Sequence, residues 1–367
     1  MRLIEGYRSV RRLFLGALIL NIAFLSIAAR ASELNVYNWS NYIDPSAIGR
    51  FESNTGIKVN YDIFESNEML EAKLLTGNSD YDVVVPTGEF LHRQISAGLY
   101  QEIDLTKVPN SRYLDPILMD AAKIFDPSNL HAVIYAWGTT GLGIDVNAAA
   151  ERGVSLDGAG WELLLDPSLA EVFADCGIAV LDDPLAMVAI TLAYQSNDPN
   201  STDASDIENA FEALSNIRSL VKNTTSSQFA SGLAAGDYCL TVGYSGDLLA
   251  LRTHQAVSRE VSFILPHQGA PLWMDMLAIP VQAGNIDGAH SWINEMISIE
   301  TSIGFTNSVR YPTANIEANK LVMPEVRMEL DEIFTEVAMR SLWTPKPKPA
   351  EYHRLVNRLW IRWKSGQ

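Results

Sequence analysis

The sequence predicts an α/β protein built as two lobes with a cleft between them. Short apolar strands alternate with helices over about a hundred residues after position 33, and a second region of the same kind follows from about residue 138. A chain of 367 residues is long enough for two compact units with separate cores. The βαβα order indicates a mostly parallel sheet with helices on both faces.

The first αβ region is expected to contain three strands and three helices. The strands are expected at 34–37, 58–63 and 81–85, and the helices at about 45–54, 67–76 and 90–97. Asp44 followed by Pro45 is typical of an N-cap and a first helical residue. Gly56, Gly77 and Gly98 are expected to end the helices, because glycine readily adopts the left-handed conformation found there.

The second αβ region has expected strands at 177–181 and 238–242 and a helix near 207–221. A strand at 274–280 is expected to return to the first lobe, and the last ninety or so residues are expected to be helical. The proline-rich segment 345–349 indicates a stiff connector to a final basic helix. We therefore expect the first lobe to comprise 32–136 and about 270–305, and the second lobe with the C-terminal helices to comprise 137–269 and about 306–367.

The N-terminal segment 1–31 is typical of a cleaved secretory signal. Three arginines, Arg8, Arg11 and Arg12, precede an apolar run, and small residues flank Arg30 where a signal peptidase would read them. Cleavage would leave a chain that starts near Ser32. The alternative is an uncleaved membrane anchor, since about 17 apolar residues is the short limit for a span.

The two cysteines, Cys176 and Cys239, agree with export to an oxidising compartment. If they pair, closing the long loop between them would stabilise the fold by roughly 4 kcal/mol. The alternative is two unrelated buried thiols. No C-x-x-C pair and no nearby histidine supports a redox motif or a zinc site.

The charge balance is strongly acidic. The 44 Asp and Glu residues against 27 Lys and Arg residues give a net charge of −17, which excludes a nucleic-acid binder that works through a basic surface. Residues 346–367 hold six of the basic residues and one acid, so the acid excess lies before them. Such a field would attract a polycation, and plain solubility is the alternative explanation.

Enzyme chemistry has little support in the sequence. The stretch 243–246 begins like a nucleophile elbow, but Asp247 stands where G-x-S-x-G requires glycine. The histidines are scattered at no ligand spacing, and no phosphate-binding glycine motif occurs. We expect no catalysis, no cofactor and no metal site.

Aromatic residues recur beside carboxylates or small polar residues at the ends of expected strands. The groups are Trp39 with Ser40 and Tyr42, Tyr244 with Asp247, Trp273 with Asp275, and Tyr311. Aromatic faces attract ammonium groups by about 0.5 to 2 kcal/mol each, and carboxylates fix them with charge-assisted hydrogen bonds. The combination favours an aliphatic cation as ligand. For each aromatic residue alone, the alternative is a place in the core.

Seven segments together resemble the periplasmic polyamine-binding proteins of ABC transporters, and the putrescine-binding branch in particular. They are VYNWSNYI (36–43), GIKVNYDIFESNEMLEAKL (56–74), YDVVVPTGEFLHRQISAGL (81–99), AWGTTGLGIDV (136–146), DPNST (198–202), GDYCLTVGYSGD (236–247) and SVRYPTAN (308–315). The resemblance covers nearly the whole chain after the signal segment, with the motifs in the same order.

The resemblance implies a periplasmic binding protein fold of type II that closes over a linear polyamine in its cleft. The residues that match the ligand-binding positions of the family are Trp39, Ser40, Tyr42, Thr87, Tyr244, Asp247, Trp273, Asp275 and Tyr311. Ser227 and Gln228 align with a loop at the cleft edge. The two cysteines fall where the putrescine-binding branch has its own pair.

Two departures from the family pattern concern the ligand. Asn41 stands where the putrescine-binding branch has an aspartate, and Ala186 stands where it has a glutamate. Each lost charged hydrogen bond would weaken binding by roughly 1.5 to 3 kcal/mol. Putrescine, spermidine and norspermidine all remain open as ligands.

The resemblance implies a monomeric receptor in the periplasm that passes its polyamine to the inner-membrane permease of an ABC transporter. The alternative is a periplasmic sensor that reports polyamine levels to a membrane signalling protein without transport. No nucleic acid is expected among the partners.

Overall fold

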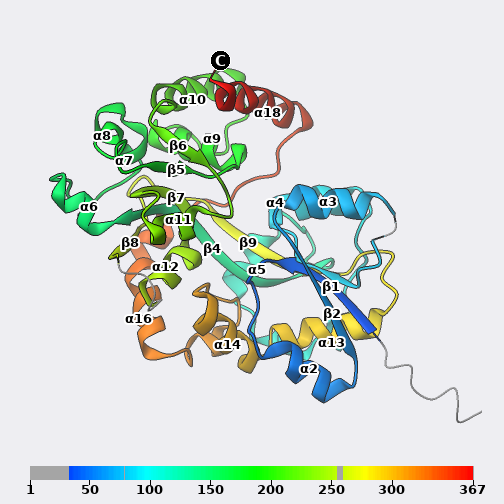
Figure 1. Ribbon diagram of the computed structural model, residues 1–367. Helices are drawn as coiled ribbons and strands as arrows, with labels where there is room; N and C mark the ends of the chain where they lie inside the picture. Colours follow the sequence, from blue (N-terminus) through cyan, green and yellow to red (C-terminus); the bar gives the residue numbers. More distant parts are fainter. Residues whose placement is uncertain (1–32, 78, 254–258, 367) are drawn as a thin grey trace, which may run out of the picture.

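The computed structural model of the chain describes residues 33–77, 79–253 and 259–366. The expected signal segment 1–31, its alternative as a membrane anchor and the expected start near Ser32 lie outside these residues. Within the described ranges, no helix is both long and apolar enough to cross a membrane. Figure 1 shows two lobes, with β4 (Ala132–Asp145) and β9 (Leu272–Ala278) running between them through the middle of the molecule.

A single sheet extends through both lobes. Its strand order is β2-β1-β3-β9-β4-β7-β5-β6, and β8 pairs with β4 beside this path. The central strand β4 is 14 residues long and buried throughout; its first half pairs with β9 and its second half with β7 and β8. The other strands are β1 (Glu33–Trp39), β2 (Lys58–Phe64), β3 (Val83–Val84), β5 (Ile178–Val180), β6 (Val221–Thr224), β7 (Leu240–Tyr244) and β8 (Val261–Ile264).

The parallel pairing expected from the βαβα order is found within each lobe, but it does not extend to the whole sheet. Among the described strands, β1 with β2 and β3, and β5 with β6 and β7, pair in parallel. The four pairings that involve β4 or β9 are antiparallel. The βαβ rhythm of each lobe predicts its parallel strands correctly, but the two strands that join the lobes pair across long stretches of chain. Their direction does not follow from the local pattern.

The helices lie around this sheet. Those at 47–55, 67–75, 88–96 and 204–217 correspond to helices expected from the sequence, whereas the others before residue 278 were not expected. Those of the first part of the chain are α2 (Ala47–Thr55), α3 (Asn67–Leu75), α4 (Gly88–Ser96), η1 (Leu105–Lys107), η2 (Pro109–Tyr113) and α5 (Pro116–Ala122). The middle part has α6 (Val146–Glu151), α7 (Glu162–Leu165), α8 (Pro167–Glu171), α9 (Pro184–Tyr194), α10 (Ala204–Ile217), α11 (Phe229–Ala235) and α12 (Ser245–Thr253). The last part has α13 (Ile286–Met296), α14 (Ile299–Val309), α15 (Ile316–Asn319), α16 (Pro324–Ile333), α17 (Glu336–Ser341) and α18 (Ala350–Ser365).

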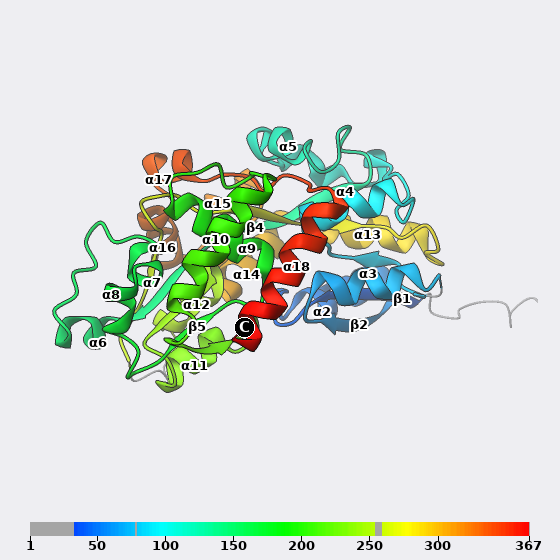
Figure 2. The ribbon, with the colours of Figure 1, turned by 90° about the horizontal axis from the view of Figure 1, so that it is seen from above.

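The C-terminal helix α18 packs on α9 and α10 of the second lobe. Figure 2 shows that its N-terminal end approaches α4 of the first lobe. The 345–349 connector therefore reaches the junction of the lobes before α18 begins.

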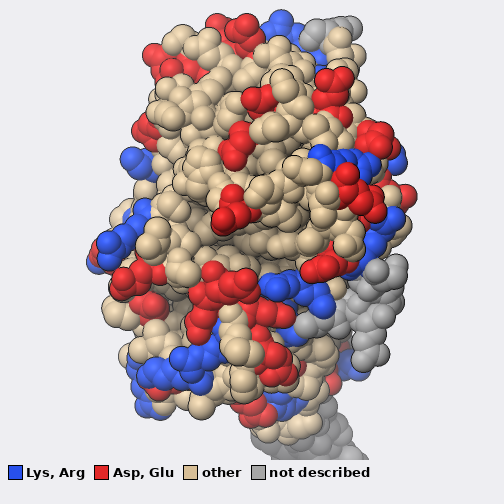
Figure 3. All heavy atoms as spheres, turned by 90° about the vertical axis from the view of Figure 1, so that its left-hand side faces the viewer, with Lys and Arg blue, Asp and Glu red and all other residues tan. Residues whose placement is uncertain are grey.

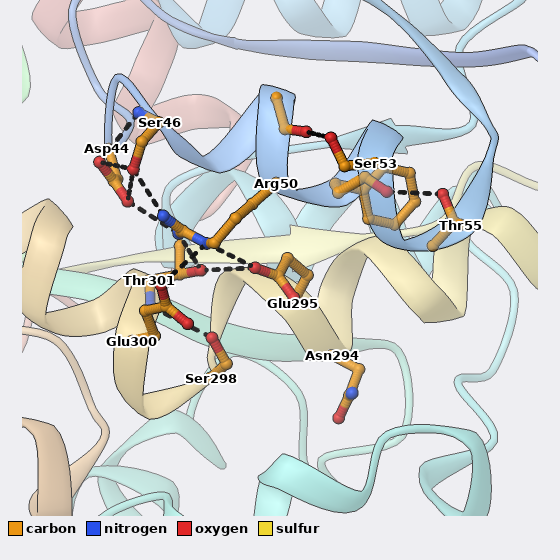
Figure 4. Close-up of polar contacts among 12 residues, drawn as sticks. Asp44, Ser46, Arg50, Ser53, Thr55, Asn294, Glu295, Ser298, Glu300 and Thr301 are labelled. Carbon is orange, nitrogen blue, oxygen red and sulfur yellow. Dashed lines mark hydrogen bonds and ion pairs between the residues drawn. The ribbon is translucent and has the colours of Figure 1, made fainter.

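The expected N-cap at Asp44 is wrong, because α2 begins at Ala47 with Ser46 as its cap residue. The Asp44 carboxylate instead accepts hydrogen bonds from the Ser46 backbone N–H at 3.0 Å and from the Arg50 guanidinium at 2.8 Å. Arg50 also donates to Glu295 and to Thr301, as Figure 4 shows. The buried carboxylate is thus held by a cation that ties α2 to α13 and α14.

Two clusters of buried apolar side chains form the cores. The first surrounds Phe51, Phe64 and Trp292, and the second surrounds Trp161 and Phe173. We propose that the two clusters mark the two lobes. The expected division near residue 305 stays a prediction: Tyr311 and Ala314 pack in the first cluster, whereas residues 352–363 of α18 contribute to the second.

A disulfide joins Cys176 to Cys239 across 63 positions of the chain, with the two Cα atoms 5.6 Å apart. It links the end of the segment after α8 to the residue before β7. Cys239 is buried within the second core. The bond therefore closes a loop that contains β5, β6 and the helices α9, α10 and α11.

Replacing both cysteines with alanine is expected to lower the free energy of unfolding by about 4 kcal/mol, because the unfolded chain regains the freedom of the long loop. Urea denaturation of the wild type and the double variant measures the difference. Dithiothreitol should destabilise the wild type by a similar amount and leave the variant unchanged. Equal stability of the two proteins in the absence of reductant would contradict the prediction.

Candidate ligand-binding site

A cavity of about 420 Å³ lies at the junction of the two lobes. Its walls come from the segment after β1, the start of α4, the end of β7, β9 and the segment after α14. The structure brings all nine sequence-predicted residues together on its lining: Trp39, Ser40, Tyr42, Thr87, Tyr244, Asp247, Trp273, Asp275 and Tyr311. Their role as ligand contacts is a proposal developed below.

Asp275 is the most enclosed acid of the cavity. It lies on β9, is 6% exposed, and accepts a 2.6 Å hydrogen bond from the hydroxyl of Thr87. Thr87 and Asp275 also form an isolated antiparallel bridge, so the backbone fixes this pair. Burial raises the pKa of Asp275 to about 6, against the opposing effect of the Thr87 and Tyr42 hydroxyls.

Asp247 faces the open space of the cavity from the first turn of α12. Its side chain remains accessible to solvent although protein surrounds it on the cavity walls. The Tyr311 hydroxyl donates a 2.5 Å hydrogen bond to its Oδ2. Desolvation within the cleft raises the pKa of Asp247, while the bond from Tyr311 lowers it.

Aromatic rings enclose these two acids in edge-to-face contacts. The ring of Trp273 lies 5.9 Å from that of Tyr244 and 5.2 Å from that of Tyr311, and the Tyr42 ring lies 5.4 Å from Tyr311. Phe229 packs edge-on against Tyr244 at 5.5 Å. Edge-to-face packing fixes each ring by its neighbours. The cavity thus combines acids with aromatic surfaces, which suits a ligand with cationic ends and an aliphatic middle.

Two glycines that sequence reasoning missed make room for these rings. A Cβ atom at Gly138 would lie 2.5 Å from the Trp273 ring, and one at Gly246 would lie 2.5 Å from the Tyr311 ring. No side chain fits at either position without moving a ring. Gly138 lies inside β4, where a glycine often marks the close approach of another group, but no strand was expected there from the sequence.

The positions of the two departures from the resemblance also line the cavity. Asn41 has a left-handed backbone conformation with φ of 53°. Ala186 lies in the first turn of α9, where its N–H donates to the Asp183 carboxylate at 3.1 Å. Ser227 lines the cavity, whereas Gln228 is not among its lining residues.

A second acid pair, Glu89 and Asp183, lines the same cavity and was missed by sequence reasoning. Burial, and next Asp183, raise the pKa of Glu89 to about 7. Burial also raises the pKa of Asp183 to about 6, although it caps α9 through the N–H groups of Leu185 and Ala186. The usable signals were the position of Glu89 two residues after Thr87 and the N-cap pattern at Asp183.

The fold and the cavity define a two-lobed binding protein, and the comparisons place it in a family. The bacterial extracellular solute-binding protein family matches residues 46–329. The chain belongs to this family.

The relatives with curated names include the putrescine-binding periplasmic protein SpuD of Pseudomonas aeruginosa. It is 37% identical over 353 residues, which cover 95% of this chain and 96% of SpuD. The putrescine-binding periplasmic protein PotF of Escherichia coli is also 37% identical, over 93% of this chain and 94% of PotF. Among solved structures, a putative spermidine/putrescine ABC transporter protein from Listeria monocytogenes superposes with a TM-score of 0.81 at 27% identity. That match covers 92% of this chain and all of the other.

The raised pKa of Asp275 predicts a pH-dependent stability of the ligand-free protein. The folded-state pKa of about 6 exceeds that of a hydrated aspartate, so the protonated carboxyl favours folding. Its contribution is complete below about pH 4 and lost as the pH rises through 6. Between pH 4 and 7, the wild type should therefore lose about 1 to 3 kcal/mol of unfolding free energy relative to Asp275→Asn.

Urea titrations of both proteins at half-unit pH steps measure this difference. The asparagine variant keeps the shape of the side chain without its titration. If the unfolding free energies of the two proteins change with pH in the same way over the whole range, the burial of a carboxylate without a cationic partner at Asp275 is contradicted.

Proposed function

We propose that this protein is a periplasmic receptor that binds a polyamine in its cleft and delivers it to the inner-membrane permease of an ABC transporter. The receptor acts as a monomer, carries out no catalysis and uses no cofactor. Its ligand is putrescine, spermidine or norspermidine. The relatives SpuD and PotF, which carry the name of putrescine, support the assignment because they align over almost the whole chain. No comparison favours the alternative of a sensor.

The observation that carries the proposal is the arrangement of Asp247 and Asp275 in one aromatic-walled cavity. Both carboxylates are hydrogen-bonded by hydroxyls of the protein, but neither has an Arg or Lys partner among the described residues. A protonated diamine supplies the two cations at its ends, and its methylenes fit between the rings of Tyr244, Trp273 and Tyr311.

The ligand contacts come from both lobes. Tyr42 and Tyr311 belong to the first core, whereas Asp247 lies in the first turn of α12, which packs on β7 and β8 of the second lobe. A polyamine that touches both groups would stabilise the closed arrangement by the contacts that exist only there.

The acidic surface supports capture of a polycation. Asp and Glu side chains lie on both sides of a hollowed band across the face in Figure 3. A net charge of −17 raises the encounter rate of a small cation at low ionic strength.

The direct test is titration calorimetry of the protein purified from the periplasmic fraction, with putrescine, spermidine, norspermidine and cadaverine. Binding of at least one polyamine is expected. Absence of heat for all four at millimolar concentration would refute the proposed function.

Asp247→Asn and Asp275→Asn should each weaken polyamine binding by about tenfold or more, because each removes the charge that an ammonium group contacts. Asp237→Asn is the matched control. Asp237 is exposed and lies before β7, whereas Asp247 follows it. Calorimetry of the three variants measures the effect. Wild-type affinity in both site variants would show that the ligand binds elsewhere.

Trp39→Ala should also weaken binding, through loss of an aromatic wall. Trp39 is half-buried and packs 4.4 Å from the Phe64 ring. Circular dichroism separates the two roles of this residue. A folded variant with reduced affinity agrees with a pocket wall, and an unfolded one would show that Trp39 is a core residue.

A further inference from the structure

The connector 345–349 and the two residues before it are hydrogen-bonded to other segments of the chain near the cleft, and Trp343, Pro345 and Lys348 line the cavity. The Leu272 N–H donates to the Trp343 carbonyl at 2.7 Å, and the Trp343 N–H donates to the Ala270 carbonyl at 3.1 Å. Further along, the Asn200 amide donates to the Thr344 carbonyl, and the Lys346 N–H donates back to Asn200 Oδ1 at 2.8 Å. The alternating prolines restrict the backbone of the same stretch. These bonds fix the backbone at Trp343, Thr344 and Lys346, close to Lys348 in the chain.

Lys348 brings an ammonium group to the lining of the cavity. Its Nζ donates to the Asn200 carbonyl at 2.7 Å and lies 5.2 Å from the centre of the Tyr352 ring. The side chain is half-buried, and desolvation lowers the pKa of Lys348 while Glu89 opposes this effect. No Asp or Glu forms a direct ion pair with Lys348 in the described part of the chain.

Glu89 and Asp183, the second acid pair, line the same cavity as Lys348. Glu89 Oε1 is buried and has no hydrogen-bond partner among the described residues. Lys348 lowers the pKa of Glu89, and Asp183 raises it. The acids of the cavity lining therefore include two contrasting pairs. The pair of Asp247 and Asp275 has only hydroxyl partners, whereas the pair of Glu89 and Asp183 has a lysine of the same chain beside it.

We propose that Lys348 is a specificity-determining residue whose ammonium group neutralises the acid pair of Glu89 and Asp183, so that the cleft favours a diamine over a triamine. This inference rests on the proposed polyamine binding. A diamine satisfies Asp247 and Asp275 and leaves Lys348 undisturbed. The third amino group of a triamine would meet the ammonium of Lys348, and like charges in a partly desolvated site repel each other.

The test compares the affinities of putrescine and spermidine for Lys348→Met, which keeps the length of the side chain and removes its charge. The ratio of spermidine affinity to putrescine affinity should rise about tenfold, since a third ammonium can then bind Glu89, whose Oε1 has no partner among the described residues. Lys348→Arg retains the charge and should keep the ratio of the wild type. Lys346→Met is the matched control. It removes an exposed charge from the same connector and should leave the ratio unchanged.

A double variant identifies the acid involved. Glu89→Gln combined with Lys348→Met should lose most of the gain for spermidine, because the partner of the third ammonium is gone. Thermal unfolding followed by circular dichroism verifies each fold, and Lys348→Gln replaces Lys348→Met if the latter does not fold.

The outcomes separate the two proposals. If the wild type binds neither polyamine, the proposed function fails. If it binds one and the ratio stays unchanged in Lys348→Met, or rises equally in Lys346→Met, the role of Lys348 is overturned.

Discussion

The rest of the site depends on two carboxylates that line the cleft without a cationic partner among the described residues, and one of them, Asp275, is buried. Asp275 is buried under the Thr87 hydroxyl, and Asp247 is held by Tyr311. Enclosing a charged group away from water is unfavourable unless a partner compensates, and hydroxyls compensate only in part. Because this compensation is incomplete, burial raises the pKa of Asp275. In the proposed function, an ammonium group of the ligand would supply the missing cationic partner, and the electrostatic attraction to the carboxylate would contribute to the free energy of binding.

The shared sheet makes this arrangement possible. β9 pairs with β3 of the first lobe and with β4, so Asp275 lies on the strand that connects the two halves. β4 continues into the second lobe and pairs there with β7, which ends at Tyr244 directly before the helix that carries Asp247. Ligands of α/β folds bind beyond the ends of strands, and here the ends belong to both lobes. Small residues such as Gly138 then allow the rings to close around the acids.

Sequence reasoning succeeded where short stretches of chain decide the structure. Left-handed Gly56 ends α2, and the strands of the first lobe alternate with helices as the pattern indicates. The family resemblance, which rests on whole motifs, also identified nine residues that all line one cavity. The predictions failed where contacts between segments far apart in the chain decide the structure. The Asp44 carboxylate binds Arg50, which is shared with Glu295 of a helix far along the chain. Likewise, Glu89 and Lys348 line the same cavity only because the C-terminal connector returns to the cleft.

The central claim is that the ligand supplies the cation that the enclosed acids lack. Calorimetry of putrescine binding at pH 6, in buffers of different ionisation enthalpy, measures the protons exchanged on binding. An arriving ammonium group lowers the pKa of Asp275 from about 6, so binding should release protons. The release should shrink as the pH rises above 7, where the carboxylate is already ionised. Binding without proton release at pH 6 would contradict this account.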